Sequence, residues 1–197
     1  MLRSRRNYAL GLLALLLTLS GCNLGGSYAF KTGAISPPRD APLLPLVDQT
    51  GQPFDLTSLK DKVVLLYFGY TACPDACPTT LSDWTEVKRL MGDDADHLAF
   101  VMVTVDPERD TTEQLDRYLD FFDPSFIGLT GDPAAITAAE QDYGIVAVRE
   151  DFGESAMGYT MNHTTSYWVI DTDTQLRLVV SHGTDPEIVA EDLRHLL

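Results

Sequence analysis

The chain has few basic residues for its length. Lysine and arginine together number 14 against 29 aspartates and glutamates, so the 197 residues carry a formal charge of −15. Removal of residues 1–21 would delete three arginines and no acidic residue, which leaves a charge of −18. A chain of this sign repels phosphate backbones, so we expect no nucleic-acid partner. A solvated acidic exterior is the simplest interpretation of the charge, and steering of a basic partner or a cation is the alternative.

Long apolar runs are also scarce, and none reaches the roughly 20 residues of a comfortable bilayer span. The stretch "YALGLLALLLTL" at residues 8–19 follows three arginines and ends in the small residues "SGC", which is typical of an export signal. The tetrapeptide at the end of this segment, Leu19-Ser20-Gly21-Cys22, resembles the lipobox of bacterial lipoproteins. That resemblance implies cleavage before Cys22 and a lipid on its sulfur, which would hold the protein at the extracytoplasmic face of a bacterial membrane. An uncleaved anchor helix is the alternative.

Residues 22–40 are rich in glycine, serine and proline and show no periodicity, which predicts a flexible tether. We therefore expect the folded domain to occupy residues 41–197. A chain of this size buries roughly 68–70% of its unfolded surface. Neither a disulfide nor a metal ion is required to hold such a core together.

The domain alternates between two kinds of pattern. Short apolar runs rich in β-branched and aromatic residues predict buried strands, and longer amphipathic segments with caps predict helices. The expected strands are 62–70, 97–106, 126–131 and 145–150, with a hairpin of 164–171 and 175–183, and the expected helices are 78–92, 111–122, 132–144 and 185–197. This order predicts an α/β protein of thioredoxin-like fold, a mixed sheet with helices on both faces.

Two of the three cysteines, Cys73 and Cys77, stand four residues apart after the first predicted strand. Cys77 directly precedes Pro78, so we expect it at the cap of the following helix, where the helix dipole would lower the pKa of its thiol. The spacing is compatible with a reversible disulfide. It suits a shared metal ion better, because two sulfurs that bind one ion at about 2.3 Å stand roughly 4 Å apart.

One of the four histidines differs from the others in its place. His163 lies in "GYTMNHTTSYWVID", just before the hairpin, where a thioredoxin-like sheet would bring it against the cysteine loop. Cys73, Cys77 and His163 would make a soft three-ligand set that favours Cu(I) and accepts Cu(II), one copper per chain. Structural zinc normally requires four protein ligands and is the lesser alternative.

At this point the chain resembles the Sco/SenC copper proteins, also called PrrC. The resemblance covers the domain from about residue 41 and depends on "YFGYTACPDACPTTL", on "VTVDPERDT" at 103–111, and on His163 before an aromatic-rich strand. It implies that Cys73, Cys77 and His163 bind one copper ion. It also implies a metallochaperone that helps assemble the dinuclear copper centre of cytochrome c oxidase, with the copper-site subunit of that oxidase as partner and an upstream copper chaperone as a second one.

Five further residues lie near these motifs in the sequence. Asp106 and Arg109 match family positions near the site, where they would support the ligands or form a turn. Asn162 stands where family members commonly carry aspartate, which removes a charge beside His163 and is expected to alter copper(II) affinity or the orientation of the ring. Met157 and Met161 are either auxiliary thioether ligands or packing residues.

Three other interpretations remain. In a thiol–disulfide oxidoreductase, Cys73 would attack, Cys77 would resolve, and the substrate could be the cysteines of the copper target. However, thioredoxin-type enzymes resemble one another in a cis proline before the facing strand, and this chain has no proline between Pro133 and Pro186. A thiol peroxidase would leave His163 unexplained. A purely structural lipoprotein domain with an incidental disulfide would explain neither the acidic helix cap nor His163, and whether the protein is an enzyme stays open.

The segment that carries His163 is also expected to move. Gly153 and Gly158 and the lack of proline predict an arm over residues 152–165 that closes over copper and opens for transfer. Equal hydrogen exchange in apo and copper-loaded protein across this segment would contradict that hypothesis.

Overall fold

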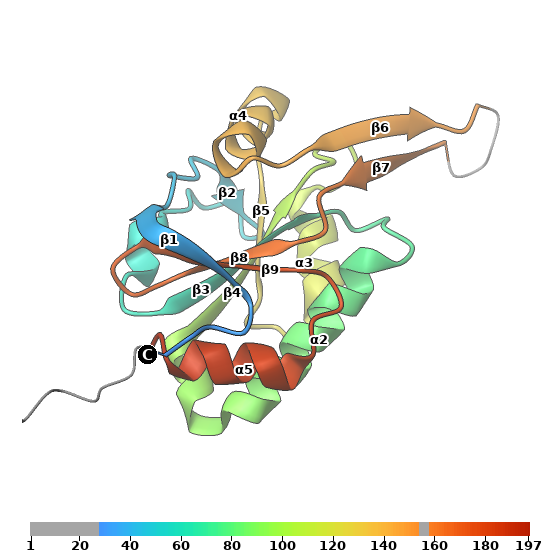
Figure 1. Cartoon of the computed structure of the whole chain (residues 1–197). Helices are drawn as coiled ribbons and strands as arrows, with labels where there is room; N and C mark the ends of the chain where they lie inside the picture. Colours follow the sequence, from blue (N-terminus) through green and yellow to red (C-terminus); the bar gives the residue numbers. More distant parts are fainter. Residues whose placement is uncertain (1–27, 154–157) are drawn as a thin grey trace, which may run out of the picture.

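The computed structural model describes residues 28–153 and 158–197. A seven-stranded mixed sheet forms its centre, in the order β1-β9-β8-β3-β4-β5-β2 (Figure 1). The strands are β1 (Gly33–Asp40), β2 (Val47–Asp48), β3 (Val63–Gly69), β4 (Leu98–Thr104), β5 (Ile127–Thr130), β8 (Tyr167–Ile170) and β9 (Gln175–Val180). The helices are α2 (Ala76–Met91), α3 (Thr112–Asp120), α4 (Pro133–Tyr143) and α5 (Pro186–Arg194), with 3-10 turns η1 (Leu56–Leu59) and η2 (Gly92–His97).

The middle of the sheet is fully buried. Every residue of β3 and of β4 is buried, and the two strands pair in parallel. β5 continues the parallel part, whereas β8 and β9 add antiparallel strands on the other side of β3. Strands buried on both faces require helices on both faces, which agrees with the predicted α/β fold.

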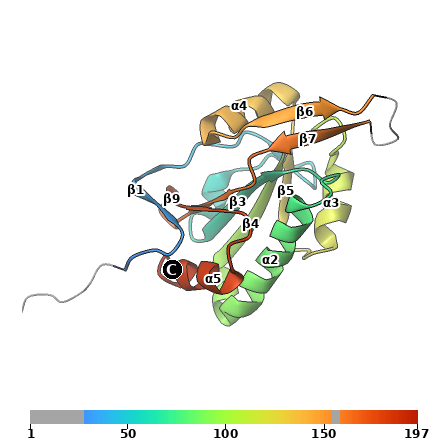
Figure 2. The ribbon, with the colours of Figure 1, turned by 45° about the vertical axis from the view of Figure 1, so that its right-hand side comes forward.

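The helices form two layers around this sheet. α2 and α5 pack together on one face, and α4 lies on the opposite face (Figures 1 and 2). Asp132 and Asp185 cap α4 and α5 as predicted, because each side chain accepts a hydrogen bond from a backbone N–H of the first turn and a proline follows. The β3–α2–β4 and β4–α3–β5 units connect neighbouring parallel strands and advance the sheet in one direction. Because such crossovers share one hand, α3 is expected on the same face as α2.

A small second sheet stands outside the first. β6 (Ala147–Asp151) and β7 (Tyr159–His163) form an antiparallel hairpin that projects beyond α4 (Figures 1 and 2). We call this β6–β7 hairpin the arm from here on; it overlaps the segment 152–165 that the sequence predicted to move, of which residues 154–157 lie outside the described ranges. The sequence predicted a strand close to β6 but treated 159–163 as a loop, because its mixed polar and aromatic residues show no buried alternation.

The start of the folded part differs from the prediction. Residues 33–40, assigned to the flexible tether, form β1, which pairs antiparallel with β9. Pro37 and Pro38 argued against a strand, but β1 lies at the edge of the sheet, where a residue without an N–H is tolerated, and its register shifts between Ala34 and Arg39.

The segment before β1 is attached as well. The buried carboxylate of Asp192 on α5 accepts hydrogen bonds from the Tyr28 hydroxyl (2.7 Å) and from the backbone N–H groups of Lys31 and Thr32. The domain therefore begins at or before residue 28. Within the described ranges no helix is long and apolar enough to cross a bilayer. The predicted signal peptide 1–21, Cys22 and Met157 lie outside these ranges.

Candidate metal centre

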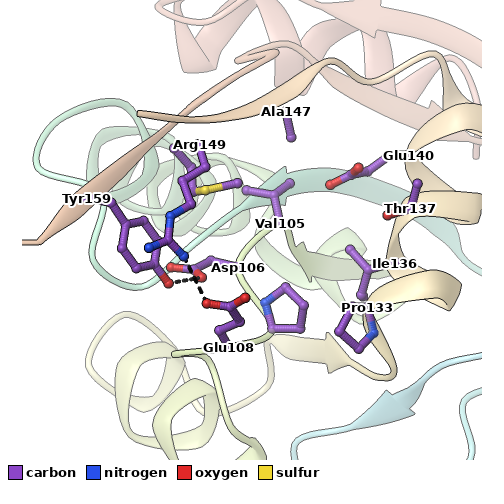
Figure 3. A pocket seen from close by; sticks show the side chains of 12 residues that line it. Val105, Asp106, Glu108, Pro133, Ile136, Thr137, Glu140, Ala147, Arg149 and Tyr159 are labelled. Atoms are coloured by element: carbon purple, nitrogen blue, oxygen red, sulfur yellow. Dashed lines mark hydrogen bonds and ion pairs between the residues drawn. The ribbon is translucent and has the colours of Figure 1, made fainter. Parts of the chain in front are cut away.

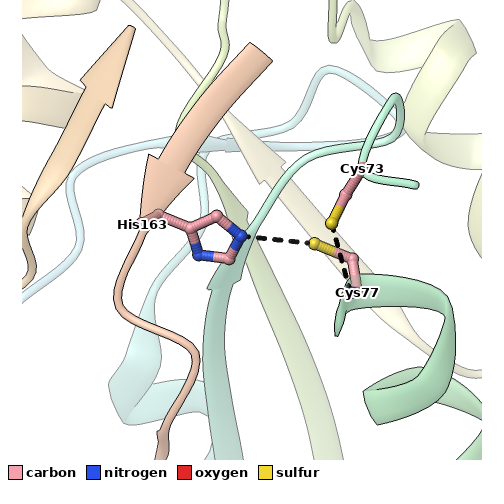
Figure 4. Close-up of side chains that lie close together, drawn as sticks. All are labelled: Cys73, Cys77 and His163. Carbon is pink, nitrogen blue, oxygen red and sulfur yellow. Dashed lines mark hydrogen bonds between the residues drawn. The ribbon is translucent and has the colours of Figure 1, made fainter. Parts of the chain in front are cut away.

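The two cysteines lie at the start of α2 (Figure 4). Cys73 is in the loop after β3, and Cys77 is in the first turn of the helix, whose cap residue is Asp75. The prediction that Cys77 caps the helix was therefore wrong by two residues. Pro78 indicated the first turn correctly, but it occupies the third helical position. Cys73 is partly exposed, whereas Cys77 is 0% exposed.

The pocket that holds the Cys77 sulfur is closed by β3. The Tyr67 hydroxyl donates a hydrogen bond to the sulfur at 3.4 Å. A Cβ atom on Gly69 would lie 3.0 Å from the same sulfur and 2.7 Å from the Tyr67 ring. Glycine at position 69 is thus required for the helix to bring Cys77 this close to the strand.

His163 reaches the cysteines from the end of β7. Its Nδ1 lies 2.8 Å from the Thr164 carbonyl oxygen, a contact in which the ring nitrogen must be the donor. Its Nε2 lies 3.5 Å from the Cys77 sulfur. The ring stands edge-on to the rings of Tyr67 and Tyr70, with centroids 5.9 and 5.6 Å away. These contacts orient the ring so that Nε2 faces the thiols, which is the arrangement of a histidine that binds a metal.

The three side chains form one ligand cluster. The Cys73 sulfur, the Cys77 sulfur and a ring nitrogen of His163 all lie within 4.8 Å of one another, and both thiols are free. The backbone N–H of Cys77 also points at the Cys73 sulfur, at 3.4 Å. An ion bound at about 2.0–2.3 Å to each atom needs separations of roughly 4 Å. The chemistry and the spacing of these donors therefore fit one soft metal ion.

The two thiols have opposite acidities. A hydrogen bond from the Cys77 thiol, assisted by His163 and by backbone N–H groups of the first helical turn, outweighs burial and holds the pKa of Cys73 at about 3. Burial, followed by the hydrogen bond to Cys73 and the charge of that thiolate, raises the pKa of Cys77. We had predicted a lowered pKa for Cys77. The prediction was wrong because burial of the Cys77 sulfur outweighs the effect of the helix start, while the backbone N–H groups of Asp75 and Cys77 stabilise the Cys73 thiolate instead.

Asp106 and Arg109 hold the arm in place. Asp106 is 3% exposed and accepts hydrogen bonds from the Tyr159 hydroxyl (2.7 Å) and from Arg109 Nε. Arg109 also donates to the Tyr159 carbonyl at 3.1 Å and lies 3.7 Å from the centre of that ring. Both residues therefore contact the strand that carries His163, and neither contacts the thiols. Support of a ligand-bearing segment describes them better than turn formation alone.

Tyr70 makes the second attachment of the arm. Its hydroxyl forms a 2.8 Å hydrogen bond with the Thr160 hydroxyl and accepts one from the Met161 backbone N–H at 3.4 Å. Arg109 and Tyr70 together satisfy backbone groups on the edge of β7 that faces away from β6. The arm is thus joined to the body along this edge.

Asn162 and Met161 do not contribute to the cluster in the way that was considered. The Asn162 side chain is exposed and donates to Glu150 on β6 at 2.8 Å, so it turns away from the ring of His163. Met161 lines a cavity beside Tyr159 and Arg149. Its packing in that cavity favours the interpretation as a packing residue.

Asp110 is a buried residue of this region that the sequence analysis missed. It is 0% exposed and accepts hydrogen bonds from the backbone N–H and hydroxyl of Thr71 (3.0 and 2.6 Å) and from the Thr104 hydroxyl (2.7 Å). Thr71 begins the cysteine loop, so Asp110 ties that loop to β4. The only signal in the sequence was the run "DPERDT", which does not show which of its acids turns inward.

The comparisons with known proteins agree with one another. A family model described as SCO1/SenC matches residues 42–197. A SCO2-like protein of Rickettsia felis is 35% identical over 149 residues, which is 76% of this chain and 73% of that protein. The structure of Bradyrhizobium japonicum ScoI with copper bound is 39% identical, with a TM-score of 0.74, and the match covers 81% of this chain and 100% of that one. Apo Sco1 from Thermus thermophilus is 33% identical, with a TM-score of 0.76, over 88% and 100% of the chains. The predicted thioredoxin-like fold is thereby confirmed.

Proposed function

The chain belongs to the SCO1/SenC family, and from that premise we propose that it is a copper metallochaperone. In this proposal it is anchored by Cys22 at the extracytoplasmic face of a bacterial membrane and delivers copper to the dinuclear copper centre of cytochrome c oxidase. The observation that carries the proposal is the convergence of Cys73, Cys77 and His163, whose ligand atoms lie within 4.8 Å of one another. The copper-bound structure of a relative 39% identical to this chain supports the choice of metal.

The arrangement suits a cargo ion better than a structural one. Within the described residues the cluster holds three ligands, whereas structural zinc sites normally close with four. Cys77 is enclosed between Tyr67 and Gly69, but Cys73 is partly exposed. A thiolate of the recipient could therefore reach the ion from the Cys73 side while Cys77 still holds it. Two thiolates and one imidazole are soft ligands that retain Cu(I) and also accept Cu(II).

The first test is anaerobic copper binding to the reduced protein. The soluble chain of residues 27–197 would be titrated beside His163→Ala and Cys77→Ser, with stoichiometry and the thiolate charge-transfer band of the Cu(II) form as readouts. We expect one copper per chain and at least a hundredfold loss of affinity in both variants, since removal of a direct ligand costs more than the 10–100-fold of a supporting residue. Binding that ignores His163 would refute the three-ligand site.

The membrane part of the proposal needs its own test. Cys22→Ser in the full-length chain should abolish labelling by a fatty-acid analogue and release the domain from the membrane fraction. Unchanged membrane attachment of the variant would instead favour an uncleaved anchor helix.

A thiol–disulfide oxidoreductase is the second candidate, and the contrast between the two thiols favours it. Cys73 has a low pKa and is partly exposed, as an attacking thiol must be. Its thiolate would attack a target disulfide and release one target thiolate. Cys77 would then displace the second, which leaves the target reduced and Cys73–Cys77 oxidised. Equilibration with glutathione buffers tests this: a pair that stays reduced at every glutathione disulfide ratio could not donate electrons reversibly.

A further inference from the structure

Beside the metal centre lies a cavity that the copper site does not use. It has a volume of about 280 Å³ and opens between α4, the loop after β4 and the arm (Figure 3). Tyr159 and Met161, two of its lining residues, belong to β7, the strand that ends in His163. Small-molecule sites usually measure about 300–1,000 Å³. This cavity is at or below that range, so it is better matched to one side chain than to a cofactor.

The lining of the cavity is apolar at its wall and acidic at its rim. Val105, Ile136 and Ala147 contribute apolar surface. Glu140 extends from α4 toward the same space, and the structure gives its carboxylate no hydrogen bond or ion pair among the described residues. Burial raises the pKa of Glu140, and a nearby positive charge would remove that penalty.

The other charges around the cavity are already paired. Arg149 is held by Glu108 (3.0 Å) and Asp151 (2.9 Å), and Asp106 by Arg109. Among the residues that line the cavity, three acids stand against one arginine, an excess of two negative charges. The cavity therefore repels anions and would gain free energy from a cation.

We propose that this cavity, which we call the rim pocket, receives a lysine or arginine side chain of the protein that exchanges copper with Cys73, Cys77 and His163. The apolar wall accommodates the aliphatic stem, and Glu140 pairs with the charged head. Charge complementarity selects the partner, since the chain from residue 22 onward carries −18 and favours a basic docking surface. The partner assignment rests on the proposed function, because the cavity shares β7 with His163 and a protein docked at the copper ligands would lie beside it.

Occupancy of the rim pocket would act on the same strand that holds the third ligand. A side chain seated against Tyr159 and Met161 contacts β7 two and four residues before His163. Docking would thus affect the position of His163 without any direct contact between the partner's side chain and the ion.

The binding test uses small probes and backbone amide NMR on the apo protein. n-Butylammonium mimics a lysine side chain, n-butanol is its neutral counterpart, and the peptide acetyl-Gly-Gly-Lys-Gly-Gly-amide represents a partner. We expect the ammonium and the peptide to shift the amides of Thr137 and Ala147 in a saturable manner, and n-butanol to bind at least about fivefold more weakly, as for a partly exposed ion pair.

The matched variants lie on one helix. Glu140→Gln should weaken n-butylammonium about fivefold. Asp142→Asn removes an exposed charge two residues away on a different face of α4 and should change the affinity less than about twofold. A second variant, Thr137→Lys, places a lysine three residues before Glu140 at the rim and should abolish binding by occupying the pocket itself.

Several outcomes would overturn the proposal. These are the absence of saturable shifts, equal affinity for n-butanol and n-butylammonium, or binding of n-butylammonium with exclusion of the peptide, which would indicate a site for small amines only. Copper stoichiometry of the same wild-type sample is measured separately. If the protein takes up no copper but binds the lysine peptide, the copper function is refuted, whereas the binding of a basic side chain in the rim pocket is confirmed.

Discussion

The body of the protein and the arm hold the copper ligands in very different ways. Cys73 and Cys77 follow β3, whose seven residues are all buried in the seven-stranded sheet. His163 ends the two-stranded arm, in which four of the five β6 residues are exposed. A lone two-stranded hairpin is marginally stable at best. Two ligands are therefore fixed by the core, and the third depends on how the arm is attached.

The attachment of the arm is local and mainly polar. Its hydrogen bonds join Asp106 and Arg109 to Tyr159, and Tyr70 to Thr160 and Met161, and an ion pair joins Arg149 to Glu108. Ala147 and Met161 add a small apolar contact with the core. A metal ion that bridges the thiols and His163 would bind only the attached form and would stabilise it by mass action. Substitutions that weaken the attachment of the arm should therefore lower copper affinity with little effect on the packing of the central sheet. The predictions below test that division, from the largest effect to the smallest.

The largest expected contrast is in the reactivity of the two thiols of the apo protein. The pKa of Cys73 lies far below its ordinary value, so its thiolate persists as the pH falls from 8 to 6, whereas an ordinary thiol loses about tenfold in thiolate for each pH unit. At pH 6 we expect iodoacetamide to alkylate Cys73 roughly a hundredfold faster than the buried Cys77. Mass spectrometry of timed, quenched samples measures both rates.

The same experiment separates the contributions of body and arm. The hydrogen bond from Cys77 is the largest cause of the low pKa, and His163 contributes less. In His163→Ala the rate at Cys73 should therefore remain nearly flat between pH 8 and 6. A rate that falls tenfold per unit in that variant would show that the arm, and not the body, maintains the thiolate.

The next largest effect is expected from Arg109→Ala. This change leaves the buried Asp106 carboxylate without its cation and removes the bond to the Tyr159 carbonyl. Loss of one partner of a buried pair costs about 3–5 kcal/mol, and the partial exposure of Arg109 lowers the expectation to about 2–3 kcal/mol. Urea unfolding measures the stability, and copper affinity should fall by about 10–100-fold because His163 loses its support.

The control for Arg109→Ala is an arginine whose ion pair is exposed. Arg89 pairs with Glu86 on the surface of α2, where solvent screens the pair, so Arg89→Ala should leave the urea midpoint and the copper affinity unchanged. If Arg109→Ala destabilised the protein but bound copper normally, Arg109 would serve the core and not the arm.

The division between body and arm also explains which parts the sequence could predict. The buried strands and the helices with Asp–Pro starts have local signals, namely apolar runs and caps, and the structure has them near the predicted limits. β1 and β7 lack such signals. β1 contains two prolines that only an edge strand tolerates, and β7 is held by side chains from distant loops, Tyr70 and Arg109, instead of by its own burial.

The candidate site shows the same pattern. Residue type and spacing were sufficient to select Cys73, Cys77 and His163, because few other residue combinations hold a soft metal. Three features could not be predicted in this way: the direction of the two thiol pKa shifts, the outward orientation of Asn162 and the role of Asp110. They depend on the exact residue at which α2 begins and on the register of the strands. A shift by one residue reverses the facing of a strand side chain, so patterns cannot settle these points.

A smaller effect is expected from Tyr70→Phe. The change removes the hydroxyl that joins Thr160 and Met161 but keeps the ring that contacts His163. We expect a loss of about 1 kcal/mol, confined to the arm, with copper affinity reduced less than tenfold. Hydrogen exchange of the β7 amides provides the readout. Tyr118→Phe is the matched control, since the buried Tyr118 hydroxyl has no hydrogen-bond partner in the described residues and its loss should cost nothing.

The smallest effect is expected from Asn162→Asp, which introduces the residue that the resemblance to the family led us to expect. Asn162 lies on the outer face of the arm and donates to Glu150. An aspartate there would face a like charge instead, which should loosen the arm by about 0.2–1 kcal/mol, as for like charges on paired strands. Copper(II) affinity should therefore fall by less than about fivefold, as measured by competition with a chelator. The double variant Asn162→Asp with Glu150→Gln should recover it, because the repulsion is gone. A tenfold gain in affinity from Asn162→Asp alone would instead place this side chain at the ion, and the outward orientation would then be wrong for the loaded protein.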